Sequence, residues 1–246
     1  MDVSEINFAV LVASLIVAST PLVLAALGEL IVEKSGVLNL GVEGMMIIGA
    51  VAGFIVGVET GSAYIGMIAA AVAGALLSLL FAFIILIMQA NQVASGLALT
   101  IFGLGIAALM GHPYTGIKSP QIQSFSIPFL NDIPILGTML FQHDLIVYLS
   151  LIFVLAIWYF LNRMRAGLIL RSVGEDHDVA HSLGYRVVTI RFLAITFGGA
   201  MAGVGGGYLS LVRVPQWTEG MTAGAGWIAL ALVVFSGWRP FRLLIG

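Results

Sequence analysis

Polar side chains that could bind a solute are few in this sequence, and most stand inside long apolar runs. The candidates are Asn39, Glu43, Asn91, Gln92, Ser95, Thr100 and Trp227. A polar group is costly inside a membrane, so a function is a reasonable expectation for each, although each could instead cap a helix or bond two helices together. No nucleophile stands at a useful spacing from a base, and the sequence has no phosphate-binding glycine loop. The chemistry on offer is hydrogen bonding and aromatic contact, and we predict that the chain is not an enzyme.

A second polar group lies in the hydrophilic stretch 163–191, between apolar segments. Its charged residues include Arg163, Arg165, Arg171, Arg186, Arg191, Glu175, Asp176 and Asp178. Such a stretch is most simply a loop outside the bilayer, and its arginines indicate the cytoplasmic side. Within it, the segment 174–185 starts with acidic residues and closes near Gly184, which is typical of the two ends of a short helix. We expect this helix to transmit force from a soluble partner, with an amphipathic connector lying on lipid headgroups as the alternative.

The composition identifies an integral membrane protein. The chain has 246 residues, of which 60% are hydrophobic and only 9% charged, whereas about a quarter of the residues in globular domains are charged. A formal net charge of −2 argues against nucleic acid as a partner. There is no cysteine, and two lone histidines, His112 and His143, are weak evidence for a metal, so we predict none.

The elements that position these residues are apolar helices. Uncharged runs at 6–28, 62–88, 94–111, 145–162 and 192–212 predict membrane spans. Small residues at 69–78 and the glycines at 198–207 predict close helix packing. The segment 112–143 is rich in proline and poor in Lys and Arg, which indicates an outer loop. We therefore predict an all-α polytopic bundle that forms one transmembrane domain over residues 1–246, with broken or re-entrant helices.

Two segments are candidates for such broken helices. At 28–57, Glu29, Glu33, Lys34 and Glu43 interrupt an apolar run together with several glycines, so the segment is either a break inside the bilayer or an ordinary cytoplasmic turn. Glu43 lies near a helix start, where it could serve as a cap or contact a solute. The apolar run 227–237 is about half a span, so it is either re-entrant or a full span that begins nearer Met221. Pro21 predicts a kink, or the start of the final portion of its helix.

Four strings together resemble the permease subunits of ABC transporters. They are LGELIVEKSGVLNLGVEGMM, NQVASGLALTIFGLG, GLILRSVGEDHDVAHSLGYRV and GMTAGAGWIALALVVFSGWRP, in that order along nearly the whole chain. The resemblance is to the class that imports nucleosides and simple sugars, which is related to the branched-chain amino acid and ribose permeases. It also implies that members of the class continue for further helices beyond the equivalent of the last residue, so the chain is expected to lack those helices.

The resemblance implies a role for the acidic segment. In that class a G-E-N-P-x-A-A pattern ending in glycine forms the coupling helix on the ATP-hydrolysing subunit. The matching positions here are Gly174, Glu175, Asp176, His177, Val179, Ala180 and Gly184. His177 stands where the pattern has proline, Val179 where alanine is common, and Thr100 replaces an asparagine often found after the SGLAL string.

The resemblance further implies the partners of an importer. These are a separate ATPase subunit that binds the ATP, a second homologous permease and an extracytoplasmic substrate-binding lipoprotein, assembled in the bacterial plasma (inner) membrane. The chain itself would bind no cofactor. A neutral, hydroxyl-rich solute such as a nucleoside or sugar suits amides and an aromatic platform better than full charges.

Two other functions remain open for this sequence. An ion-coupled secondary carrier of small polar solutes would need ionisable relays within the membrane, for which Glu29, Glu43 and Glu59 are the candidates. A membrane scaffold that transports nothing is the other.

Overall fold

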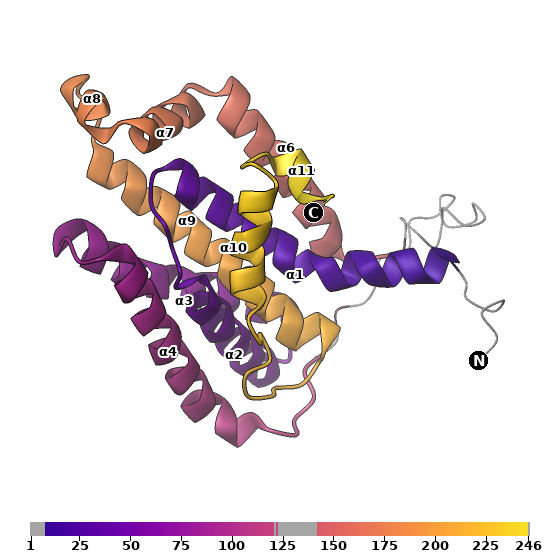
Figure 1. Cartoon of the computed structure of the whole chain (residues 1–246). Coiled ribbons are helices and arrows are strands. Elements are labelled where there is room, and N and C mark those ends of the chain that lie inside the picture. The colour runs from indigo at the N-terminus through magenta and orange to yellow at the C-terminus, as the bar shows by residue number, and fades with distance from the viewer. Residues whose placement is uncertain (1–7, 121, 123–141, 246) are drawn as a thin grey trace.

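The computed structural model describes residues 8–120, 122 and 142–245, and this part of the chain is built from helices (Figure 1). The long helices are α1 (Phe8–Lys34), α2 (Val42–Thr60), α3 (Ala63–Ala82), α4 (Gln92–Gly111), α6 (Leu145–Arg163) and α9 (Val187–Tyr208). The short helices are α7 (Arg165–Glu175), α8 (His177–Ser182), α10 (Ala225–Phe235), α11 (Pro240–Leu243) and a 3-10 turn at His112–Tyr114. Single π-helical turns extend α3 over Phe83–Ile87 and α9 over Leu209–Arg213. In the described residues 6 helices are long and apolar enough to cross a membrane, so the predicted all-α polytopic fold is confirmed.

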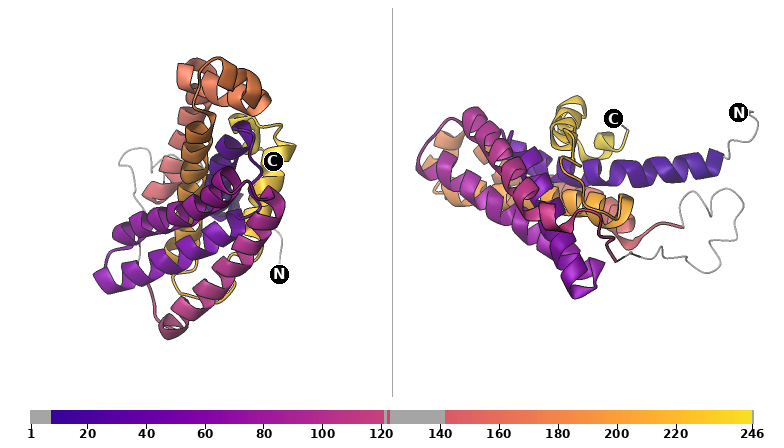
Figure 2. Two further views of the ribbon diagram at one scale, coloured as in Figure 1. Left: turned by 90° about the vertical axis from the view of Figure 1, so that its left-hand side faces the viewer. Right: turned by 90° about the horizontal axis from the view of Figure 1, so that it is seen from below.

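Helix α9 lies at the centre of the bundle, packed against α1, α2 and α3 (Figures 1 and 2). Glycines allow the backbones to approach closely, as the glycine-rich sequence of α9 predicted. A Cβ added to Gly74 of α3 would lie 2.8 Å from the Gly203 Cα, and one added to Gly28 of α1 would lie 2.8 Å from the Gly198 carbonyl oxygen. Real Cβ atoms do not approach other atoms so closely, so these contacts fix α9 against its neighbours.

The two ends of the bundle carry different segments. At one end, the Gln92 side chain at the start of α4 accepts a hydrogen bond from Leu38 N (2.9 Å), and Gly36 lies against Gly174 at the end of α7. At the other end, Gly111 of α4 packs against Trp217, which follows α9. The acidic loop and the start of the segment 112–143 therefore lie at opposite ends, as expected. Most of that segment, 123–141, lies outside the described residues.

The chain between α1 and α2 turns back into the bundle. Asn39 bonds to Glu29, which lies five residues before the end of α1, or about 7.5 Å along the helix at 1.5 Å per residue. The chain consequently folds back alongside the last turns of α1 before α2 starts, which favours the break over the ordinary turn. Helix α1 itself runs through Pro21 as one helix.

Helix α10 is the second broken element. It has 11 residues and starts at Ala225, and the chain that follows it reaches Trp238, which bonds to Glu33 at the α8 end of the bundle. The segment therefore crosses the bundle with only its second half helical. The re-entrant alternative is wrong, and the alternative of a span beginning nearer Met221 holds except that its first part is not helical. The segment that leads into it, around Trp217, comes from the end of the bundle opposite to α8 (Figure 1).

Candidate functional site

The segment 38–43, which comprises the unwound residues 38–41 and the first two residues of α2, is the centre of a buried polar cluster. Asn39 is fully buried, and its Nδ2 donates to Glu29 Oε2 (3.2 Å) while its backbone N donates to Glu29 Oε1 (3.3 Å). Its Oδ1 in turn accepts a hydrogen bond from Gly41 N (3.0 Å). One side chain thus ties the unwound backbone to α1 and leads into α2.

The backbone of this segment is also served by side chains from other helices. The Leu40 carbonyl accepts hydrogen bonds from Thr100 Oγ1 of α4 (3.1 Å) and from Trp227 Nε1 of α10 (3.4 Å). Gly96 of α4 packs directly against Leu40 and Gly41. A break in a helix within the bilayer is tolerated when neighbouring groups satisfy its backbone in this way.

Glu43 joins the starts of α2 and α10. Its Oε1 accepts hydrogen bonds from Thr222 Oγ1 (2.5 Å) and Gly224 N (3.0 Å), and its Oε2 accepts one from Gly226 N (2.7 Å). The first N–H groups of a helix have no partner within the helix, and a carboxylate is favoured there. Glu43, a residue of α2, therefore caps the start of α10, and both of its carboxylate oxygens accept hydrogen bonds.

The predicted pathway residues divide by exposure. The buried ones, Asn39, Glu43 and Thr100, hold backbone in place. Trp227 is 46% exposed, Gln92 and Ser95 are half-buried, and Asn91 is exposed and caps α4 by accepting a hydrogen bond from Ala94 N (3.0 Å). The structure brings all of them to the start of α4 or to the segment 38–43.

The sequence analysis did not assign Glu29, Thr222 and the two glycines at 224 and 226 to this cluster. The available signal was the G-x-G at the start of a short apolar helix, since glycine allows the backbone N–H groups to approach an anionic group closely.

Helix α8 forms most of the predicted coupling helix, with one correction to its bounds. Asp176 is its N-cap, and its Oδ1 accepts hydrogen bonds from Asp178 N and Val179 N (both 3.0 Å). Gly174 and Glu175 belong instead to the end of α7, because Asp176 adopts an extended conformation and separates the two helices. His177 is the first residue of α8, the position where proline is also favoured.

The far end of α8 closes as predicted on a glycine. Gly184 has a φ of +88°, which residues with a side chain rarely adopt. Tyr185 N donates to the Ala180 carbonyl (3.2 Å) across this turn.

The apolar residues of α8 and its C-cap lie in two different surroundings. Ala180 is buried against Val173 of α7 and Val187 of α9. Val179 and Leu183 remain 54% and 69% exposed. The outward surface of α8, defined here as Val179 and Leu183 with the acidic residues before them, is available to another molecule.

The base of this helix pair contacts the broken segment. A Cβ on Gly174 would overlap the Lys34 carbonyl oxygen and lie 3.0 Å from Gly36 N. Arg191, at the start of α9, donates from Nε to the Ser35 carbonyl (3.0 Å). The α7–α8 pair is thus packed on the turn that leads into the polar cluster.

The chain matches one family over almost its full length. Residues 11–246 match the family model described as the branched-chain amino acid transport system permease component. The chain belongs to this permease family. It is a multi-pass membrane protein and a permease component of a transport system, which is not itself catalytic.

Several relatives carry names of ABC transporter permeases. A Haloferax volcanii protein named provisionally as a glucose ABC transporter permease, TsgC13, is 42% identical over 233 residues, covering 93% of this chain and 71% of the relative. The guanosine ABC transporter permease NupQ of Bacillus subtilis is 34% identical, with coverage of 99% and 80%. The nucleoside ABC transporter permease NupC of Lactococcus lactis is 30% identical, with coverage of 96% and 78%. No solved structure matches the chain significantly.

The family membership and the geometry both count against the ion-coupled carrier. Glu29 accepts hydrogen bonds from Asn39, Glu43 from the start of α10, and Glu59 from the Tyr114 hydroxyl (2.7 Å). Each carboxylate thus serves neutral donors of its own. In the described part of the chain, no group of three His, Cys, Asp or Glu residues is placed to hold a metal ion.

Proposed function

We propose that this chain is the permease subunit of an ATP-driven ABC importer and carries nucleosides or simple sugars. The observation that carries the proposal is the continuous set of contacts from the outward surface of α8 to the polar cluster. It runs from α8 through Gly174 to the end of α1, and from there through the segment 38–43 to α4 and α10. Force on α8 would therefore reach the groups that line the pathway.

The solute contacts in this proposal come from the accessible members of the cluster. Trp227 offers half of its ring as a platform, and Gln92, Ser95 and Asn91 offer hydrogen-bonding groups nearby. Asn39, Glu43 and Thr100 hold the backbone behind them. Amides, hydroxyls and an aromatic face suit a neutral solute rich in hydroxyl groups. The names of the glucose and nucleoside permease relatives support this solute class.

The partners follow from the same proposal. A separate ATPase subunit binds ATP and docks on α8, a second homologous permease completes the pathway, and a binding lipoprotein delivers the solute at the opposite end. A six-residue helix such as α8 is too short to be stable alone, so a groove on a partner would stabilise it.

The test compares two leucines that are equally exposed in the structure. Leu183 on α8 is 69% exposed, and Leu193 on the membrane-spanning α9 is 67% exposed. Leu183→Ala removes an apolar contact with the ATPase and should weaken its binding about tenfold, since a buried leucine side chain contributes about 1.5–3 kcal/mol. Leu193→Ala removes the same atoms outside the docking surface and should leave binding unchanged.

The measurement is ATPase binding to the permease complex in lipid nanodiscs, followed by uptake of labelled guanosine and glucose into vesicles. Equal binding and uptake for Leu183→Ala and Leu193→Ala would show that α8 is not the coupling element. Uptake that stops on addition of an uncoupler but survives ATP depletion would instead favour a secondary carrier.

A further inference from the structure

A cavity lies at the same end of the bundle as α8, apart from the polar cluster. It has a volume of about 670 Å³ and is formed by the end of α1, by α6, by α7 and by the turn from α10 into α11. Its charged lining residues are Lys34, Arg171, Arg239 and Arg242, and no acidic residue lines it. Four cations from three segments, the end of α1, α7 and α11 with its cap, therefore face one space.

Within the described residues, none of these cations has a carboxylate oxygen within 4.0 Å. In that part of the chain the single ion pair within 4.0 Å joins His177 and Asp178, on α8. The Nε of Arg171 is buried and has no hydrogen-bond acceptor. A buried donor of this kind costs free energy unless something accepts its hydrogen bond, so the cavity is incomplete without an acceptor.

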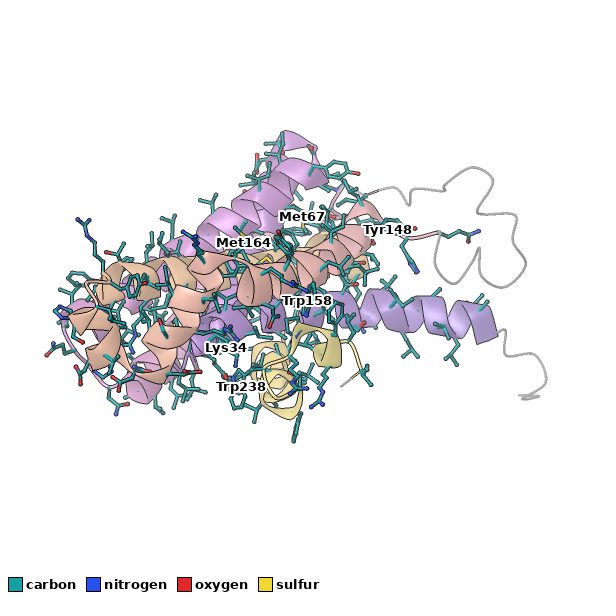
Figure 3. All side chains as sticks on the ribbon, turned by 90° about the horizontal axis from the view of Figure 1, so that it is seen from above. Lys34, Met67, Tyr148, Trp158, Met164 and Trp238 are labelled. Carbon is teal, nitrogen blue, oxygen red and sulfur yellow. The ribbon has the colours of Figure 1, made fainter. Side chains whose placement is uncertain are left out.

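The nearest carboxylates share a neighbouring cavity with Lys34 and Arg171, and Glu33 Oε1 is, like Arg171 Nε, buried without a hydrogen-bond partner. Glu33 accepts a hydrogen bond from Trp238 Nε1, and with Glu175 it lines a smaller neighbouring cavity of about 200 Å³. Lys34 lies over the Trp238 ring, 5.8 Å from its centre, and Figure 3 shows these two side chains side by side. Lys34 and Arg171 thus face both cavities, whereas Arg239 and Arg242 line only the larger one, which has no carboxylate.

The surroundings of the cavity match the surface of a membrane. Trp158 on α6 and Phe241 on α11 lie 5.6 Å apart between ring centres, and both line the cavity together with Trp238. Tryptophan is enriched at the level of lipid headgroups, and basic pockets between membrane helices on the cytoplasmic side bind anionic headgroups.

We propose that this cavity binds a phosphate group at the inner membrane surface, carried by an anionic phospholipid or present as soluble phosphate. The guanidinium groups of Arg171, Arg239 and Arg242 offer several donors each, in the planar arrangement that suits phosphate oxygens. Lys34 adds a further positive charge. The bound phosphate would join the end of α1 to α11 and to α7, next to the coupling surface.

The test is native mass spectrometry of the protein in a neutral detergent during titration with phosphatidylglycerol, with phosphatidylcholine as the lipid of zero net headgroup charge. The double variant Arg239→Gln/Arg242→Gln should weaken phosphatidylglycerol binding about thirtyfold, at about 1 kcal/mol for each basic residue removed. The matched control, Arg165→Gln/Arg186→Gln, removes two exposed arginines from the same end of the bundle that do not line the cavity. It should change binding less than twofold.

Equal loss in both double variants would overturn the proposal, since it would indicate general attraction to surface charge. No loss in the cavity variant, or equal binding of both lipids, would also overturn it. Millimolar inorganic phosphate distinguishes the two sources. Displacement of phosphatidylglycerol would support soluble phosphate as a ligand, and retention of the lipid would support a lipid-borne phosphate.

Discussion

Glu43→Gln is the substitution that most directly tests how the two broken helices are held together. The Glu43 carboxylate accepts three hydrogen bonds, from Thr222 Oγ1, Gly224 N and Gly226 N, at 2.5, 3.0 and 2.7 Å. Glutamine has one acceptor atom instead of two. With its oxygen facing Thr222 and Gly224, its amide NH₂ would face the Gly226 N–H, donor against donor.

The size of the destabilisation at the start of α10 follows from the number of hydrogen bonds lost. The variant loses one hydrogen bond to a charged acceptor, which contributes about 1.5–3 kcal/mol, and leaves a buried N–H without a partner. It also loses a negative charge at the start of a helix, which contributes up to about 2 kcal/mol in partly buried geometries. A total of about 3 kcal/mol corresponds to roughly hundredfold more frequent opening at the start of α10, since about 1.4 kcal/mol is a factor of ten.

Hydrogen exchange measured by mass spectrometry on peptides from 221–235 would detect this change. Faster exchange is expected there, with little change in the α3 and α9 peptides. Glu43→Asp keeps the charge but shortens the reach, so an intermediate effect is expected, and this variant still tests the argument if Glu43→Gln does not fold.

The control is Glu59→Gln, which removes the charge from an exposed carboxylate that accepts one hydrogen bond, from Tyr114. Its effect should be confined to the contact between the ends of α2 and α4. Unchanged protection of α10 in Glu43→Gln, or the same loss in Glu59→Gln, would refute the capping argument.

Three further predictions concern packing, the α8 cap and the unwound segment. Gly203→Ala should destabilise the bundle by several kcal/mol in thermal unfolding, because its Cβ would overlap the Ala70 carbonyl oxygen, whereas Gly105→Ala should be neutral because nothing lies within 4 Å. Asp176→Ala should cost about 1 kcal/mol of α8 stability, because it removes the N-cap, and exchange in the α8 peptides should rise while the α9 peptides stay protected. Asn39→Ala should lower the free energy of unfolding by about 1–3 kcal/mol, because a buried carboxylate loses the amide that donates to it; an unchanged midpoint in a denaturant titration would contradict this.

The sequence was a good guide to elements whose determinants are local. Acidic residues followed by glycine predicted a short helix in the acidic loop, and the structure confirms it with Asp176 as the cap and Gly184 in a left-handed turn. The start of that helix was set at Gly174, three residues before His177, where α8 begins, since the extended Asp176 separates α7 from α8. Small residues on α3 and α9 predicted close packing because only glycine and alanine allow two backbones to meet.

The candidate site was predictable as a set of residue types but not as an arrangement. Glu43 could be recognised as an acidic residue at a helix start, and the sequence left its role open between a cap and a solute contact. The helix that it caps is α10, and its partner Thr222 lies 179 positions further along the chain. The outward face of α8 likewise depended on packing, since Val187 of α9 buries Ala180 and leaves Leu183 exposed.

The sequence by itself determined that this protein lies in a membrane, where five of the six candidate spans of the described residues lie, and which loop carries the charge; it did not single out α2 (Val42–Thr60) as a span and left open whether the segments 28–57 and 227–237 contain broken helices. Those properties depend on hydrophobicity, on backbone propensity and on neighbours within a few residues. Only the tertiary structure decided that the unwound residues 38–41 are supported by Glu29, Thr100 and Trp227, and that Glu43 joins the starts of α2 and α10. A buried polar group is stable only with a partner, and the partner is selected by distance in the folded chain, which the order of residues does not specify.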